Sequence, residues 1–227
     1  MRSFYYGYWI VVAGFVTQFV AVGMANYVVG SFMIPMTEEF AWSRAEFTAS
    51  RSIGQLVFAA TGFLIGSHID RLGGRPFMIV GGFLLVAAMF YLSTIQTLAE
   101  WWLVNGLLLT IGAAMIGNLV VNVSLGKWFV ERRGKAVALA GMGISLAGII
   151  LPPITTFLVD NFGWREAWRI LGAAALLLTL PAACLVRRSP EDYQLHPDGR
   201  TAEEVSAGLG EAARLDFARS MTRAQAM

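Results

Sequence analysis

The stretch GSHIDRLGGRP, Gly66 to Pro76, separates two long apolar runs and carries two arginines, an aspartate and three glycines. Glycine permits backbone conformations that other residues avoid, so a glycine-rich stretch of this length predicts a tight turn. Charged residues in a short connection between apolar runs are typical of a loop at a membrane surface. The stretch therefore predicts a turn between two helices that cross a membrane.

Composition supports a membrane protein and argues against several other classes. Hydrophobic residues make up 56% of the 227 residues and charged residues only 14%, which is too little polar surface for a soluble globule of this length. The single cysteine, Cys184, can form no intrachain disulfide, and His68 and His196 have no cysteine partners for a metal site. The sequence contains no glycine-rich loop ending in Lys-Ser or Lys-Thr, the motif that binds nucleotide phosphates. We expect no metal, no cofactor, no enzymatic activity and no nucleic-acid partner.

Six apolar runs follow one another along the chain. At ~1.5 Å per residue, a helix of about 19 residues spans a hydrocarbon core of ~30 Å. Buried helices of a soluble bundle would need polar faces, which these runs lack. The runs are Tyr8–Met36, Ala45–Ile69, Phe77–Ile95, Trp101–Leu125, Ala136–Val159 and Trp168–Val186. The sequence thus predicts an all-α polytopic membrane protein, with a six-helix domain over residues 1–188. A polar cytoplasmic linker or tail over residues 189–227, partly disordered or a short surface helix, would follow it.

Basic residues gather on one side of this predicted topology. The loops on the side of both termini hold Arg2, Arg71, Arg75, Lys127, Arg132, Arg133, Lys135, Arg187 and Arg188, against Arg44, Arg51, Arg165 and Arg169 on the other side. Because cytoplasmic loops are enriched in lysine and arginine, both termini are expected in the cytoplasm. The expected location is the cell membrane, in particular a bacterial inner membrane.

The second run begins with a helix-start signal. Ser43 and Glu46 have the spacing of a capping box, in which each side chain bonds the other residue's free main-chain amide. Further along, three- and four-residue steps place Arg51, Gln55, Phe58, Gly62 and Gly66 on one helix face. This face is polar at its outer end and bare at its inner end, where another helix could approach closely.

The opening stretch resembles the loop motif of the major facilitator superfamily, usually written G-x-L-a-D-r-x-G-r-k. The matching residues are Gly66, Asp70, Arg71, Gly73 and Arg75, whereas His68 and Gly74 depart from the pattern. The resemblance implies a gating motif that closes the cytoplasmic side in one conformation. Asp70 could cap a helix or pair with an arginine. The alternative is a basic loop that only fixes topology.

A second stretch, KWFVERRGKAVALAGMGISLAGIILPPI, Lys127 to Ile154, resembles the monocarboxylate transporter and oxalate/formate antiporter branches, with Arg132 and Arg133 in the loop between spans four and five. YYGYWIVV, FAWSRAE, FGWREAW and RRSPEDYQLHPDG add to the likeness. Leu108 stands where proton-coupled members often have an arginine. The resemblance implies a secondary active transporter that moves a small organic solute by alternating access, with monocarboxylates and other organic anions as the candidate solutes. It also implies two three-helix inverted repeats that form half of a twelve-helix fold.

Polar residues inside the spans are candidates for the solute pathway. They are Arg51, Gln55, Asn118, Asn122, Asn26 and Tyr27. The amides could instead bond neighbouring helices, as amides in membrane helices do. Arg51 lies ~10 Å inside the start of its helix, where its charge either faces a cavity or snorkels to the surface. If it faces the pathway, its guanidinium suits a carboxylate.

The six runs account for only one half of the implied fold. We therefore expect a second six-helix half as partner, besides the lipid bilayer and the solute. The chain could be a truncated or split product, pair with a separate half, or form a homodimer. A truncated or non-transporting membrane scaffold or receptor with the same fold remains the alternative function.

Overall fold

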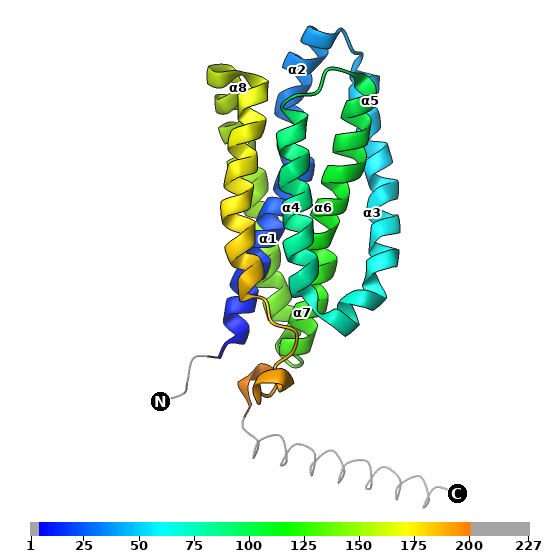
Figure 1. Ribbon diagram of the computed structural model, residues 1–227. Helices are drawn as coiled ribbons and strands as arrows, with labels where there is room; N and C mark the ends of the chain where they lie inside the picture. Colours follow the sequence, from blue (N-terminus) through cyan, green and yellow to red (C-terminus); the bar gives the residue numbers. More distant parts are fainter. Residues whose placement is uncertain (1–4, 201–227) are drawn as a thin grey trace, which may run out of the picture.

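The computed structural model describes residues 5–200, and this part of the chain forms an elongated helical bundle without β-strands (Figure 1). Its α-helices are α1 (Gly7–Val22), α2 (Val29–Phe40), α3 (Arg44–Leu72), α4 (Gly74–Leu92), α5 (Leu98–Trp101), α6 (Thr110–Ile116), α7 (Asn118–Trp128) and α8 (Arg133–Leu185). Two π-helical segments, η1 (Gly23–Tyr27) and η2 (Trp102–Leu109), join α1 to α2 and α5 to α6. Two 3₁₀ turns, η3 (Glu191–Tyr193) and η4 (Pro197–Gly199), follow α8.

Five helical stretches of the described chain are long and apolar enough to cross a membrane, and the last of them crosses twice. α8 has 53 residues but breaks at Gly163, whose φ of 79° and ψ of 160° are not helical. Both ends of α8 lie at the same end of the bundle, where Tyr6 Oη donates to the carbonyl of Leu185 and Tyr5 Oη to that of Trp128. α8 is therefore a hairpin whose two arms are the fifth and sixth predicted runs (Figure 1), and the predicted all-α polytopic fold is confirmed.

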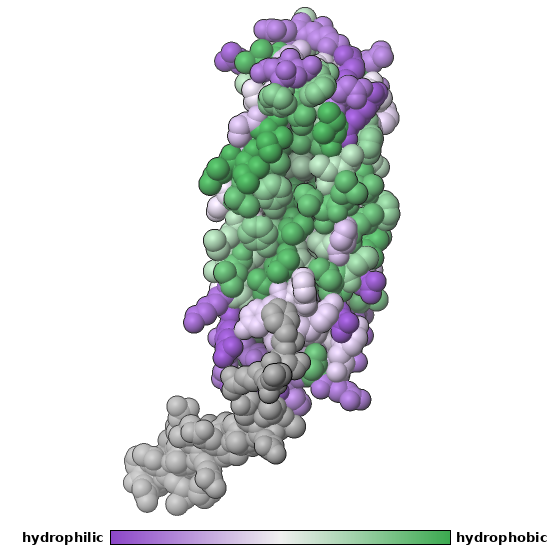
Figure 2. Space-filling model, turned by 90° about the vertical axis from the view of Figure 1, so that its left-hand side faces the viewer, coloured by the Kyte–Doolittle hydropathy of each residue, from purple (hydrophilic) through white to green (hydrophobic). Residues whose placement is uncertain are grey.

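The surface of the bundle matches a bilayer. Figure 2 shows a broad apolar band across the middle of the face turned to the viewer, with hydrophilic residues gathered toward the two ends. The first turn of α1, the α7–α8 connection and the segment after α8 all lie at the lower end in Figure 1. The two ends of the described chain are thus on the same side, as an even number of crossings requires.

At the upper end, the predicted capping box of α3 is confirmed. Ser43 Oγ accepts from the Glu46 amide at 3.2 Å, and the Glu46 carboxylate accepts from the Ser43 amide at 2.8 Å. Trp101 Nε1 donates to the carbonyl of Phe47 at 2.9 Å and so ties α5 to the first turn of α3. These bonds fix the N-terminal end of α3, and Arg51 lies two turns further along this helix.

The interior combines large aromatic side chains with glycines at helix crossings. Trp101, Trp128 and Trp168 are fully buried, and the Trp168 ring stacks on Phe32 with 4.0 Å between centroids. A Cβ on Gly112 would lie 2.6 Å from the main-chain nitrogen of Leu85, so α6 and α4 touch backbone to backbone. In lipid, helices associate through such close approach rather than through a hydrophobic drive.

Candidate functional site

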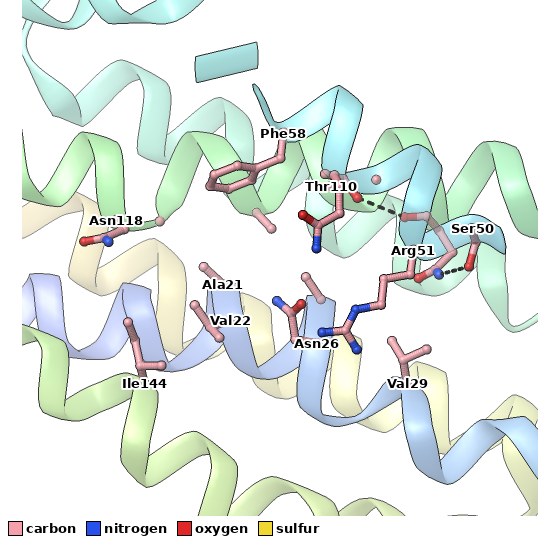
Figure 3. Close-up of a pocket in the computed structure, with 16 residues that line it drawn as sticks. Ala21, Val22, Asn26, Val29, Ser50, Arg51, Phe58, Thr110, Asn118 and Ile144 are labelled. Atoms are coloured by element: carbon pink, nitrogen blue, oxygen red, sulfur yellow. Dashed lines mark hydrogen bonds between the residues drawn. The ribbon is translucent and has the colours of Figure 1, made fainter. Parts of the chain in front are cut away.

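A cavity of about 350 Å³ opens between the first span, α3 and the span that runs from α5 to α7 (Figure 3). Most of its walls are apolar, with Val22, Phe58 and Ile144 among them. Its polar lining side chains are Asn26, Ser50, Arg51, Gln55, Asn105, Thr110 and Asn118. An apolar cavity with a few converging polar groups is the usual form of a small-molecule site.

Both π-helical segments of the described chain contribute to this cavity. η1 carries Asn26, and η2 carries Asn105. A π-turn inserts a residue into a helix and turns the following side chains relative to an uninterrupted α-helix, and such turns recur at functional sites. In this protein they direct an amide from each of two spans toward the face of α3 that bears Arg51.

Arg51 is the only charged residue among those that line the cavity. Figure 3 shows its guanidinium directed toward Asn26, not toward an acidic group. The ion pairs formed within residues 5–200 are Glu39–Arg165, Glu166–Arg169 and Glu131–Arg200, none of which involves Arg51. Because a cation in a membrane-embedded cavity is costly without a counter-charge, the cavity is electrostatically suited to an anion.

Next to Arg51, a buried amide braces the wall of the cavity. Asn105 Nδ2 donates to Ser50 Oγ at 2.9 Å, and Thr110 Oγ1 donates to the carbonyl of Asn105 at 3.2 Å. Asn105 Oδ1 is buried without a hydrogen-bond partner. Ser50, Asn105 and Thr110 were not among the predicted pathway residues. Asn105 is nevertheless an amide within an apolar run, the same feature that marked Asn118 as a candidate.

The structure brings four of the six candidate pathway residues together. Arg51, Gln55, Asn26 and Asn118 all line the cavity, and Phe58 lies on the same side of α3, as the helical spacing predicted. Asn122 instead donates its Nδ2 to Asn118 Oδ1 at 2.8 Å, so it orients that amide from one turn away. Tyr27 lies against α8, where a Cβ on Gly148 would be 3.3 Å from Cζ of its ring.

The residues of the predicted gating motif cluster at the lower end of the bundle, around the α3–α4 turn. Gly73 has φ 81° and ψ 170°, so the prediction that glycine permits this turn is confirmed. α4 begins without a side-chain cap, and the Asp70 carboxylate forms none of the ion pairs within the described chain. Instead Lys127 Nζ donates to the main-chain carbonyl of Asp70 at 2.7 Å. Gly66 faces open space, and Arg71 and Arg75 are exposed.

The two arginines of the α7–α8 connection are exposed at the same end. The Arg132 amide donates to the carboxylate of Asp198, and Arg133 begins α8. The Arg133 guanidinium lies beside α7, where a Cβ on Gly126 would be 3.3 Å from its Cζ. Sequence reasoning gave no sign that Asp198 reaches this connection, because the two are distant in the chain.

A helical membrane bundle around an apolar cavity with a few polar side chains is an architecture suited to binding a small solute, and comparison with known proteins agrees. The sequence profile of the Major Facilitator Superfamily matches residues 15–221. The chain therefore belongs to the Major Facilitator Superfamily. It is 32% identical to monocarboxylate transporter 11 of Mus musculus over 183 residues, which cover 80% of this chain and 40% of that protein.

Two further likenesses broaden the comparison. The Fujikurins efflux protein of Gibberella fujikuroi is 30% identical over 201 residues, covering 86% of this chain and 42% of that protein. The crystal structure of a bacterial homologue of the human lysosomal transporter Spinster, inward-facing and unoccupied, matches with a TM-score of 0.69 at 17% identity. It covers 89% of this chain and 47% of that one, and it establishes the shared fold alone. The chain thus spans less than half the length of the relatives that it matches.

Proposed function

We propose that this chain forms the solute-binding half of a secondary active transporter for a small organic anion, with a monocarboxylate as the first candidate. The observation that carries the proposal is Arg51, which forms no ion pair within residues 5–200 and lines a cavity to which these residues contribute no acidic side chain. A guanidinium presents two parallel N–H donors that match a carboxylate, and the low polarity of the site strengthens the pair. The apolar walls suit the hydrocarbon body of such a solute. The likeness to monocarboxylate transporters supports the same substrate class.

Each polar residue then has a role in binding. Arg51 neutralises the carboxylate, and Asn26 and Gln55, which line the same cavity, supply amide donors. Asn118, held by Asn122, marks the other end of the cavity. Ser50 and Asn105 hold the wall behind Arg51 and keep its backbone in place.

The test is anion uptake by the complete transporter, with this half altered at one position. Arg51→Ala removes the guanidinium and should lower carboxylate uptake about 10- to 100-fold, the usual worth of a charge-assisted hydrogen bond. Arg44→Ala is the matched control, because Arg44 is an exposed cation on the same helix that does not line the cavity. Neutral amide analogues of the same carboxylates should compete poorly. Uptake kinetics unchanged in Arg51→Ala would refute the proposed role.

We further propose that a second six-helix half covers the exposed apolar side of this one. On α3, Leu56, Phe63 and Leu64 are 76%, 87% and 66% exposed, and Ile149 on the first arm of α8 is 72% exposed. The matched regions cover only 40% and 42% of two relatives, so the remainder of each relative has room for such a half. Uptake should require both halves. Uptake clearly above empty vesicles by this chain alone, at dilutions that keep it monomeric, would refute the requirement.

The proposed orientation places the lower end of the bundle in the cytoplasm of a bacterial cell, with the protein in the inner membrane. Arg71, Arg75, Arg132 and Arg133 lie at that end, as the positive-inside rule requires. The polar linker of residues 189–227 would then be cytoplasmic, although residues 201–227 lie outside the described part. A reporter that is active only in the periplasm, fused after Met227, should stay inactive. Activity of that reporter would reverse the orientation.

A further inference from the structure

The segment Arg187–Arg200, which we name the strap, returns beneath the bundle after α8 and includes η3 and η4 (Figure 1). It is polar and belongs to no membrane crossing, so nothing in the proposed transport cycle requires it to be ordered. Nevertheless it contacts three separate parts of the lower end. Two of these contacts use polar or aromatic side chains, and the third is close packing against a glycine.

The first contact is a helix cap supplied from a distance. The Asp198 carboxylate accepts hydrogen bonds from three successive main-chain amides, those of Val130 at 3.0 Å, Glu131 at 2.9 Å and Arg132 at 3.1 Å. Arg132 is the N-cap of α8 and has no side-chain cap of its own. A carboxylate at a helix N-terminus satisfies free amides and favours the positive end of the helix dipole. Asp198 therefore fixes the start of α8 from 66 residues away.

The second contact surrounds Arg187 with aromatic rings. Its guanidinium carbon lies 3.8 Å from the centroid of the Tyr6 ring and 4.2 Å from that of Tyr193. The cation thus links Tyr6, which precedes α1, to Tyr193 of the strap. The Arg187 carbonyl also accepts from Trp128 Nε1 at 3.3 Å. At the far end of the strap, Arg200 pairs with Glu131.

The third contact reaches the α3–α4 turn. At Gly73, a Cβ would lie 2.9 Å from Cβ and 3.1 Å from Cα of Arg188, so the strap backbone closes over this turn. The same turn is contacted by α7, because Lys127 Nζ donates to the carbonyl of Asp70 at 2.7 Å. The strap and the end of α7 thus both hold the turn that carries the predicted gating motif.

We propose that the strap is a conformational device that couples the α3–α4 turn to the chain beyond Arg200. When it is docked, Asp198, Arg187 and Arg188 hold the start of α8, the first turn of α1 and the α3–α4 turn as one unit. When it is released, both the start of α8 and the α3–α4 turn are free to move. A pull or a binding partner on the following chain would then act on the gating motif. This inference goes beyond solute transport, and docking of the strap is tested without any solute.

Limited trypsin digestion of the full chain in detergent reports on both sites at once. Cleavage after Arg187 and Arg188 measures release of the strap, and cleavage after Arg71 measures opening of the turn; Arg75 precedes a proline and resists trypsin. Asp198→Ala should speed both cleavages about five- to thirtyfold, the factor expected from loss of a helix cap. Asp192→Ala, the same charge change at an exposed residue of the strap, should leave both rates as in the wild type.

Two further measurements keep the result decisive if Asp198→Ala folds poorly. Asp198→Asn keeps the side-chain shape and one acceptor oxygen, so its cleavage rates should be intermediate. In the wild type, the amides of Val130, Glu131 and Arg132 should exchange hydrogen slowly. Free exchange there, or equal rates in Asp198→Ala and Asp192→Ala, would overturn the docked strap. Faster cleavage after Arg187 and Arg188 with an unchanged rate after Arg71 would overturn the coupling to the turn.

Discussion

The two outer glycines of the GxxxDxxG part of the gating motif should respond in opposite ways to the same substitution. Gly66 and Gly73 both match the family pattern, and the sequence alone gives no reason to expect different effects when either is substituted. In the structure, Gly66 is inside α3 and a Cβ there would meet nothing within 4 Å. Gly73 is at the turn, with a positive φ and the strap beside it. We therefore expect Gly73→Ala to destabilise the protein and Gly66→Ala to leave it equally or more stable.

The magnitudes follow from the two backbones. At φ 81° and ψ 170°, Gly73 occupies a region essentially reserved for glycine, and alanine there costs about 1–3 kcal/mol. The added methyl also meets Arg188 at its Cα, 3.1 Å away, so a side-chain rotation alone does not relieve the contact. At Gly66, alanine gains about 0.5–1 kcal/mol, because glycine is the weaker helix former. The two variants should differ by roughly 1.5–4 kcal/mol in the free energy of unfolding.

Equilibrium unfolding in mixed micelles, followed by far-ultraviolet circular dichroism, measures this difference. Uptake by the complete transporter adds a second readout, since a Gly66 methyl would obstruct any helix of the second half that approaches there. Gly66→Ala should then lower uptake while stability is kept. Equal destabilisation of the two variants, or a less stable Gly66→Ala, would show that the assignment of the two glycines is wrong.

Three further predictions concern the ends of the bundle. Ser43→Ala should cost about 1 kcal/mol of unfolding free energy by removing the capping box of α3, whereas Ser43→Asp should retain most of it; equal loss in both variants would contradict the cap. Gly163→Ala should cost about 1–3 kcal/mol through backbone strain alone, because a Cβ there meets nothing within 4 Å; wild-type stability would show that the α8 hairpin does not need its positive φ. Burial would raise the pKa of Asp198, but its three amide donors outweigh burial and hold that pKa below the ordinary value of 3.8. Since the folded pKa is the lower one, the stabilisation by Asp198 is fully present above about pH 4 and is lost as pH falls through the folded pKa. Hydrogen exchange of the Val130, Glu131 and Arg132 amides, measured at decreasing pH, should show this loss in the wild type but not in Asp198→Asn. An identical acid profile in the two proteins would remove Asp198 as its cause.

Burial also explains the state of Tyr5, which lies beside the strap. Burial first, and then the negative charge of Asp198, raise the pKa of Tyr5 to about 12. The Tyr5 hydroxyl therefore stays protonated at neutral pH, as it must to donate to the carbonyl of Trp128 at 2.8 Å. The hydrogen bond from Tyr5 to the Trp128 carbonyl is therefore kept across the neutral pH range.

The sequence by itself determined the membrane spans, the cap of α3 and the turn at Gly73. Each depends on residues close together in the chain: apolar length sets a span, a Ser and a Glu three residues apart make a capping box, and a glycine permits a positive φ. Helical spacing likewise placed Arg51, Gln55 and Phe58 on one side of α3, where they line the cavity.

Only the tertiary structure decided which spans face that side. Spacing assigns residues to the faces of one helix but does not say how a second helix is rotated against it. The π-turns at η1 and η2 alter that rotation locally. For this reason Asn105 lies in the cavity wall, while Tyr27 faces α8. The contact between Asp198 and the start of α8 also depends on the tertiary structure. A carboxylate caps whichever free amides the fold brings within about 3 Å, and that proximity is set by the whole bundle, not by any neighbour in the chain.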